Sequence, residues 1–175
     1  MKAMRAWPEA LEEFRRGAIA SGGRGYFSIS GNSGAEAFRS FVTEHATGTV
    51  VDCGCGAQPK PIYLDHIADY RITGIDPIEA PHPFAFILGT VESVRPSGFG
   101  TVICATSLDH MKDAADALQV MRHAGRQLIF WHEGSAPVPA DMHTFHVTHD
   151  DLIAALGRPT VQRGDFFVFN GGAHA

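Results

Sequence analysis

The sequence predicts an α/β fold, a single doubly wound sheet of seven strands that is mostly parallel, with helices on both faces. Three observations predict it. Short apolar runs alternate with segments of helical periodicity from residue 48 onward, a pattern typical of parallel strands joined by right-handed crossovers. One of these runs ends in a glycine-bearing turn at residues 52–56. The last two runs are separated by Gly164 and Asp165, a two-residue turn typical of an antiparallel hairpin.

Size and composition indicate one globular domain. The 175 residues are enough for a full core and too few for two ordinary domains. Hydrophobic residues make up 45% and charged residues 19%, which excludes a disordered chain. The formal net charge is −5, so we expect no nucleic-acid partner. No run has the length and hydrophobicity of a signal peptide or bilayer span, so we expect no membrane partner and a cytoplasmic location.

The first 47 residues predict a helical cover, or lid, over a core that spans residues 48–175. Residues 7–17 have the apolar spacing of an amphipathic helix, with Gly17 as its expected end. The connector that follows is rich in Gly and Ser and contains Tyr26 and Phe27. These two aromatic residues either close over a ligand or anchor the connector to the core.

Capping signals and periodicity place the remaining elements. A second helix is expected to continue to His45, with Asn32 or Ser33 as its cap, because Ser33 and Glu36 fit a capping box. Strands are expected at about 49–53, 71–75, 84–88, 101–105 and 126–131. Further helices are expected at about 61–70, 112–123 and 149–156. The last of them has its own capping box, Thr148 to Asp151.

The turn after the first core strand predicts a nucleoside site. It contains Gly54, Cys55 and Gly56, and glycine lets a ligand lie against the main chain because it has no Cβ. Asp76 follows Gly56 by 20 residues, at the end of the next strand, where a carboxylate accepts hydrogen bonds from a ribose. Pro59 stands where a dinucleotide fingerprint requires glycine, so pyrophosphate binding is disfavoured.

The segment Asp52 to Gly56, DCGCG, resembles the first motif of the class I S-adenosylmethionine (SAM)-dependent methyltransferases of small-molecule type. The resemblance extends from about Gly48 to the C-terminus. It implies a Rossmann-like sheet in which the C-terminal hairpin places an antiparallel seventh strand between the fifth and sixth. It also implies SAM as the cofactor and a small-molecule acceptor as the partner.

The resemblance further implies where the cofactor lies. The glycine turn would line its methionine and ribose, and Asp76 would hold the ribose hydroxyls. Many relatives have an acid at the adenine position, where this chain has Thr90, so main-chain contacts at Thr90 and Val91, or the side chain of Glu92, are expected instead. The expected cofactor-binding residues are Asp52, Gly54, Cys55, Gly56, Asp76, Pro77, Thr90, Val91, Glu92, Thr106, Ser107 and Leu108.

Two places carry candidate catalytic residues. Residues 105–111 resemble the loop that faces the transferable methyl group, and within it Asp109 adjoins His110. A histidine beside a carboxylate accepts a proton near neutral pH, which suits a general base. The alternative is that Asp109 caps the next helix while His110 packs or binds substrate passively. His132 and Glu133, after the fifth strand, are a second acid–base candidate or help to shape the pocket.

We predict no metal site. The three cysteines have CxC rather than the paired CxxC spacing of zinc sites, and they suit buried packing positions in a reducing compartment. His143, His146 and His149 fall before or at the last capping box rather than on one helix face.

The first functional interpretation is a SAM-dependent methyltransferase that acts on oxygen or nitrogen of a small-molecule or saccharide-like acceptor. A catalytically inactive binding module of the same fold is the main alternative, because Thr90 replaces the acid at the adenine position. A nicotinamide-dependent oxidoreductase is a further alternative, disfavoured by Pro59 and by the terminal hairpin.

Overall fold

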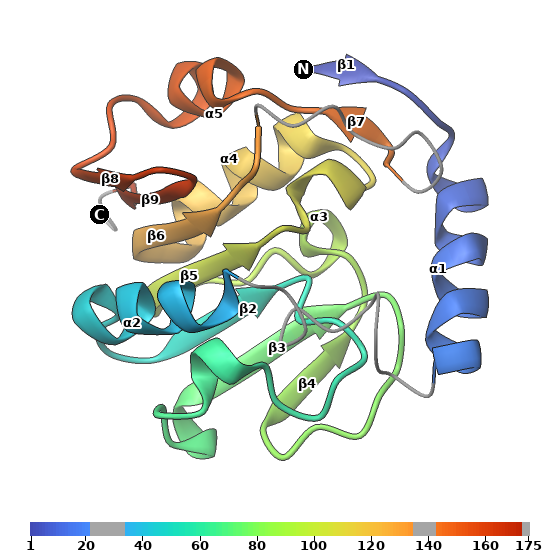
Figure 1. The fold of residues 1–175 in the computed structure, drawn as a ribbon, viewed down its shortest axis with the longest axis horizontal. Coiled ribbons are helices and arrows are strands. Elements are labelled where there is room, and N and C mark those ends of the chain that lie inside the picture. The colour runs from blue at the N-terminus through green and yellow to red at the C-terminus, as the bar shows by residue number, and fades with distance from the viewer. Residues whose placement is uncertain (22–33, 135–142, 173–175) are drawn as a thin grey trace.

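The structure is a computed structural model that describes residues 1–21, 34–134 and 143–172. The strands of its central sheet are β2 (Val50–Cys53), β3 (Ile72–Asp76), β4 (Ala85–Leu88), β5 (Phe99–Ala105), β6 (Gly125–Trp131), β8 (Val161–Arg163) and β9 (Phe166–Asn170). Within the described residues the sheet has seven strands in the order β4-β3-β2-β5-β6-β9-β8 (Figure 1). β9 runs antiparallel to both β6 and β8, whereas the other neighbouring pairs are parallel. The predicted sheet and its terminal hairpin are confirmed.

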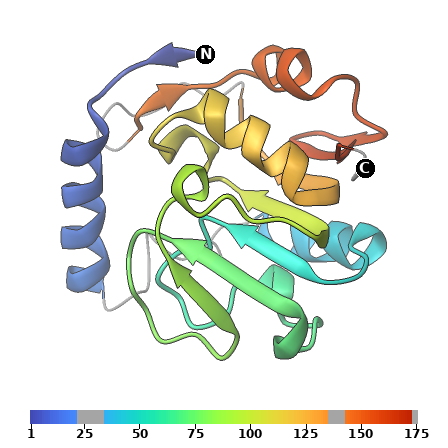
Figure 2. The ribbon, with the colours of Figure 1, turned by 180° about the vertical axis from the view of Figure 1, so that it is seen from behind.

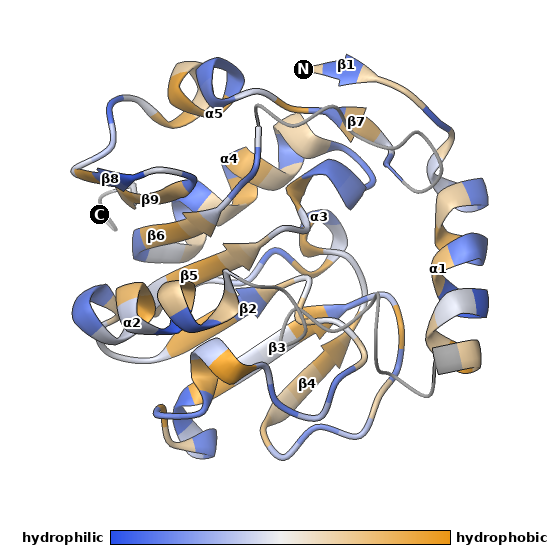
Figure 3. Ribbon diagram, viewed as in Figure 1, coloured by the Kyte–Doolittle hydropathy of each residue, from blue (hydrophilic) through white to orange (hydrophobic). Residues whose placement is uncertain are grey.

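Helices cover both faces of the sheet, as Figures 1 and 2 show from opposite sides. One face carries α2 (Ala35–His45) and the 3₁₀ helix η3 (Ile62–Leu64), and the other carries α3 (Val91–Val94), α4 (Ala114–Ala124) and α5 (His149–Leu156). Each face has its own core: Phe38 and Phe41 of α2 pack on the first, and Leu118 and Met121 of α4 on the second. Figure 3 shows that the central strands β5 and β6 are strongly hydrophobic, as expected for strands buried on both faces.

The N-terminal segment lies apart from these layers. α1 (Trp7–Ser21) stands beside the ends of the strands in Figure 1. Before it, β1 (Lys2–Ala3) pairs antiparallel with β7 (Phe145–His146), and the Met4 N–H donates to the Thr144 carbonyl at 2.9 Å. The start of the chain is therefore attached to a segment more than 140 residues away.

Local capping explains where two helices begin. The Asp113 carboxylate accepts hydrogen bonds from the N–H groups of Ala115 and Asp116, both at 3.0 Å, and so starts α4. At α5 the predicted capping box is confirmed: Thr148 and Asp151 exchange side-chain to main-chain hydrogen bonds of 3.0 and 3.1 Å.

The structure differs from the sequence predictions at two helical segments. The helix expected at 61–70 is wrong: the segment forms two short 3₁₀ helices, η3 and η4 (Asp69–Arg71), because the chain is extended at Ala68 between them. Leu64 and Ile67 are nevertheless buried in the same core as α2, which accounts for their helix-like spacing. The second segment is α3, a helix of one turn that periodicity did not predict.

The ends of the first two helices also differ from expectation. α1 continues past Gly17, because one glycine in a helix costs only about 1 kcal/mol relative to alanine and Ala18 beyond it is buried. The N-cap of α2 is Gly34, which makes no side-chain cap hydrogen bond. Ser33 itself, like Tyr26 and Phe27 of the connector, lies outside the described residues.

Candidate functional site

A cavity of about 610 Å³ opens at the carboxyl ends of strands β2 to β6. Its wall includes the turns that follow these strands, and α1 contributes Trp7, Leu11 and Phe14. The sheet order reverses between β2 and β5, which are neighbours although β3 and β4 separate them in the chain. Ligands of open α/β sheets bind at such a switch point, so this cavity is the candidate site.

The turn after β2 is held in a conformation that requires glycine. Gly54 has φ +81° and Gly56 has φ +71°, and the Gly54 N–H donates to the Ile75 carbonyl at 2.8 Å. A Cβ at Gly54 would lie 2.4 Å from the Ser107 hydroxyl oxygen, so the turn also packs too closely for any side chain there. Main chain thus forms this part of the cavity wall.

Asp76 ties the turn after β2 to the turn after β3. One carboxylate oxygen accepts from the Gly56 N–H at 2.9 Å, and the other accepts from the Ile78 N–H, also at 2.9 Å. Burial raises the pKa of Asp76 to about 6, although these two hydrogen bonds favour the ionised form. Both Asp76 and Pro77 line the cavity.

Asp52 lies beneath the turn and does not line the cavity. Its side chain is fully buried and accepts a 2.8 Å hydrogen bond from the Tyr63 hydroxyl. Burial raises its pKa to about 7. The Tyr63 hydrogen bond acts to lower the pKa, whereas the nearby Asp76 charge acts to raise it. Among the described residues, its second oxygen has no hydrogen-bond partner. Asp52 is therefore placed to support the turn from inside the core.

The turn after β4 brings Thr90 and Val91 to the cavity but not Glu92. Thr90 forms a capping box with Ser93 at the start of α3. The Glu92 side chain is buried and accepts a 2.9 Å hydrogen bond from the Asp113 N–H, so it joins α3 to α4.

The turn after β5 begins with Thr106, which has φ +52°, an uncommon conformation for threonine. Its N–H donates to the Trp131 carbonyl at 2.8 Å, and the Ser107 hydroxyl donates to the Cys53 carbonyl at 2.9 Å. These bonds tie the turn to both neighbouring strands. Thr106 and Ser107 line the cavity, whereas Leu108 is buried in the core.

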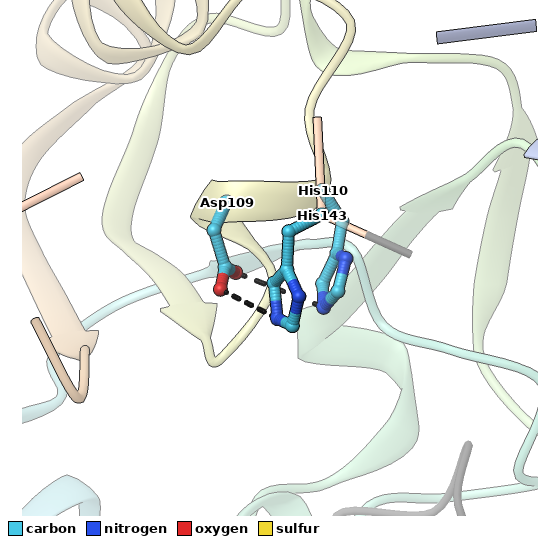
Figure 4. Close-up of side chains that lie close together, drawn as sticks. All are labelled: Asp109, His110 and His143. Atoms are coloured by element: carbon cyan, nitrogen blue, oxygen red, sulfur yellow. Dashed lines mark ion pairs between the residues drawn. The ribbon is translucent and has the colours of Figure 1, made fainter. Parts of the chain in front are cut away.

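A group of three polar side chains lies on the same wall, as Figure 4 shows. Asp109 and His110 belong to the 3₁₀ helix η5 (Leu108–His110), and His143 comes from the segment beyond β6. His143 Nε2 lies 3.0 Å from one Asp109 oxygen, and His110 Nε2 lies 3.7 Å from the other. The two imidazole rings are stacked with centroids 4.4 Å apart, and Phe14 contacts His110 edge-on at 4.7 Å.

The closer partner of Asp109 is thus His143 rather than the adjacent His110. Burial raises the pKa of Asp109, but the His143 hydrogen bond and the charges of the surrounding histidines outweigh it and lower the pKa overall. The alternative reading of Asp109 as a helix cap is wrong, because Asp113 caps α4. Sequence reasoning considered His143 only together with His146 and His149.

Those other histidines lie elsewhere. His146 is in β7, opposite Lys2 of β1. His149 Nε2 lies 3.3 Å from an Asp165 oxygen and 2.8 Å from the His132 carbonyl oxygen. His132 itself is buried on the cavity wall, with its Nε2 2.8 Å from the Val147 carbonyl oxygen, and burial lowers its pKa.

No protein-family model and no curated protein sequence matches this chain. Solved structures do. The 1,6-didemethyltoxoflavin-N1-methyltransferase of Burkholderia thailandensis, with S-adenosylhomocysteine (SAH) bound, is 12% identical with a TM-score of 0.69, over 99% of this chain and 92% of that one. The chain has the fold of the class I methyltransferases.

Two other structures support the assignment of the methyltransferase fold. A SAM-dependent methyltransferase from Thermotoga maritima is 12% identical with a TM-score of 0.59, over 95% of this chain and 99% of that one. The [4+2]-cyclase SpnF is 14% identical with a TM-score of 0.58, over 89% of this chain and 72% of that one. Two further matches are longer proteins, of which this chain spans 44% and 66%. In the described part of the chain, the helices are too short or too polar to cross a membrane.

Proposed function

We propose that the protein binds SAM and transfers a methyl group to an oxygen or nitrogen of a small-molecule or saccharide-like acceptor. The observation that carries this proposal is the contact between Asp76 and the Gly56 main chain at the mouth of the switch-point cavity. The cavity volume of about 610 Å³ falls within the range of about 300–1,000 Å³ that is usual for sites of drug-sized ligands.

On the cofactor side we assign one role to each turn. The main chain of Gly54, Cys55 and Gly56 lies against the methionine and ribose, because the two glycines carry no side chain and a Cβ at Gly54 would meet Ser107. Asp76 accepts hydrogen bonds from the ribose hydroxyls, since a carboxylate has about four acceptor positions and the two N–H donors use only part of them. Main-chain groups of Thr90 and Val91 hold the adenine, which would leave the Thr90 side chain in its capping box.

SAM supplies a methyl group on a positively charged sulfur, which a nucleophile attacks in line. The chain has to align the acceptor with that methyl group and exclude water. Alignment of two bound reactants contributes up to about 7–11 kcal/mol to lowering a barrier. Trp7, Leu11 and Phe14 of α1 supply an apolar wall that suits the exclusion of water. We therefore assign α1 the role of the predicted cover.

On the acceptor side we propose Asp109, His110 and His132 as the residues closest to the chemistry. Asp109 and His110 face the cavity from the turn after β5, and His132 faces it from the end of β6. An imidazole in such a place takes up the proton that a hydroxyl or amine loses during methylation. The Val147 carbonyl fixes the orientation of the His132 ring.

Calorimetric titration with SAH tests the proposal. We expect the wild type to bind SAH, and Asp76→Ala to weaken binding by about 10- to 100-fold, because hydrogen bonds to a charged group contribute about 1.5–3 kcal/mol. Asp150→Ala, which removes an exposed carboxylate of α5, is the matched control and should bind like the wild type. Absence of SAH binding to the wild type, or equal affinity in Asp76→Ala, would contradict the proposal.

A second candidate function is binding of the cofactor without methyl transfer. The Thr90 side chain, which cannot supply the carboxylate of many relatives, favours it, and the fold match to a cyclase shows that this fold serves other chemistry. Incubation with SAM and a panel of hydroxyl and amine acceptors, followed by mass spectrometry for SAH, separates the two candidates. A parallel fluorescence titration with NADH tests the oxidoreductase alternative.

A further inference from the structure

Asp109, His110 and His143 have the composition of a metal site. Each offers one ligand atom, and these three atoms all lie within 4.8 Å of one another. In the described part of the chain, no other group of three such side chains comes as close. Figure 4 shows the carboxylate and the two rings converging from two separate segments. Two imidazoles and one carboxylate are the protein ligands of many catalytic zinc and non-haem iron sites.

The distances suit a shared cation. Ligand atoms bound to one ion at about 2.1 Å lie about 3.0–3.4 Å apart when the angles between them are tetrahedral or octahedral. The Asp109 to His143 distance of 3.0 Å already meets this condition. The Asp109 to His110 distance of 3.7 Å is slightly longer, and no two of the three ligand atoms are more than 4.8 Å apart.

Support from neighbouring groups keeps the three side chains in place. The Thr144 hydroxyl donates to the carbonyls of Asp109 and Met111 at 2.9 and 2.6 Å, which joins the segment of His143 to η5. Exposed fractions of 16%, 19% and 11% for Asp109, His110 and His143 show that the three side chains are largely shielded from water, and all three line the cavity. Within the described residues, one Asp109 oxygen has no hydrogen-bond partner. A cation would satisfy that oxygen.

We propose that Asp109, His110 and His143 bind one divalent transition-metal ion, of the class that includes Zn²⁺, Fe²⁺ and Co²⁺, on the wall of the cavity. Two nitrogen ligands favour these ions over Mg²⁺ and Ca²⁺, which prefer oxygen. All three residues line the cavity, so the coordination positions that the protein leaves open face it. Those positions accept an oxygen atom of a small molecule, and with His110 bound to the ion, His132 is the imidazole that takes up a proton. That this molecule is the methyl acceptor, a hydroxyl compound, rests on the function proposed above.

Titration of the full-length chain with Co²⁺, after treatment with a chelator, tests the site without any cofactor or activity. We expect one equivalent to bind, with the visible absorption bands that Co²⁺ shows on nitrogen and oxygen ligands. His143→Ala and His110→Ala should each weaken binding by more than about 100-fold, since even the loss of a supporting group costs about 10- to 100-fold. His123→Ala, at an exposed histidine of α4, should bind Co²⁺ like the wild type.

Circular dichroism of the metal-free proteins shows whether both histidine variants keep the fold, and Asp109→Asn, which is isosteric, serves as a third variant. Lack of Co²⁺ binding by the wild type at millimolar concentration, or equal affinity in the folded variants, would overturn the proposal. Failure of SAH binding with intact Co²⁺ binding would instead refute the proposed function and leave the cation site standing.

Discussion

The two halves of the cavity differ in the groups that form their walls. In the nucleoside half, formed by the turns at residues 54–58, 76–78 and 89–91, the Asp76 carboxylate joins the first two turns through main-chain N–H groups, and the Gly89 N–H donates to the Asp76 carbonyl. The histidine half, formed by residues 105–112, 132–133 and 143–147, consists of side chains that converge from separate segments. The difference teaches that the first half depends on local conformation, whereas the second depends on the tertiary fold.

The largest effect is expected from Gly54→Ala, which would test whether main chain alone forms the nucleoside half. A left-handed alanine costs about 1–2 kcal/mol, and forcing its Cβ against Ser107 adds about 1–3 kcal/mol. We expect urea denaturation to show both costs, and SAH binding to be lost with them.

Gly164→Ala is the matched control for this change. Gly164 has φ +59° in the β8–β9 hairpin, but a Cβ there meets no atom within 4 Å. Gly164→Ala should lose only about 1–2 kcal/mol of stability, the cost of a left-handed alanine, and should keep SAH binding. Equal destabilisation by the two substitutions would show that the contact with Ser107 is relieved by movement of the turn.

Asp52→Asn would sharpen the comparison by showing what supports the nucleoside half from inside. The pKa of Asp52 is about 7 in the folded protein, above the usual value near 3.8. As the pH rises from about 3.8 to about 7, only the unfolded chain releases the proton, so the folded protein loses stability. Asparagine stays neutral and still accepts the Tyr63 hydrogen bond. We expect the variant to be more stable than the wild type by up to about 4 kcal/mol at pH 8.

Denaturant titrations at several pH values check this prediction. The advantage of Asp52→Asn over the wild type should stay near its maximum above about pH 7 and shrink as the pH falls from about 7 to about 4, where the carboxyl is protonated in both the folded and the unfolded chain. An advantage that does not change with pH would mean that the Asp52 charge is not what destabilises the wild type.

The smallest effect is expected from Thr144→Val, in the histidine half. Loss of the hydroxyl removes two hydrogen bonds to carbonyl groups and should cost about 1–2 kcal/mol. SAH affinity should not change, whereas Co²⁺ affinity should fall by about tenfold, because Thr144 holds the segment of His143 against η5. Thr144→Ser keeps the hydroxyl and should restore most of the affinity. Loss of SAH binding in Thr144→Val would break the separation between the two halves.

The same contrast explains what the sequence predicted. The glycine turn, the Asp76 position and the Gly164 hairpin turn all follow from local requirements on φ or on strand ends, which a sequence displays directly. The partnership of His143 with Asp109 has no such signal, because 34 residues separate them and only the fold brings them together.

Short elements escaped prediction for a related reason. α3 has four residues and β1 and β7 have two each, so each contains about one period of a helical or strand pattern and none contains a repeat. The helix expected at 61–70 shows the reverse error: residues buried against α2 imitate helical spacing, although the chain between them is not a continuous helix.

The pairing of β1 with β7 connects the α1 wall of the cavity to the segment that carries His143. The Met4 N–H donates to the Thr144 carbonyl, and Thr144 directly follows His143 in the chain. The α1 wall of the cavity and the segment that carries His143 are therefore joined through main-chain hydrogen bonds, so the position of one constrains the position of the other.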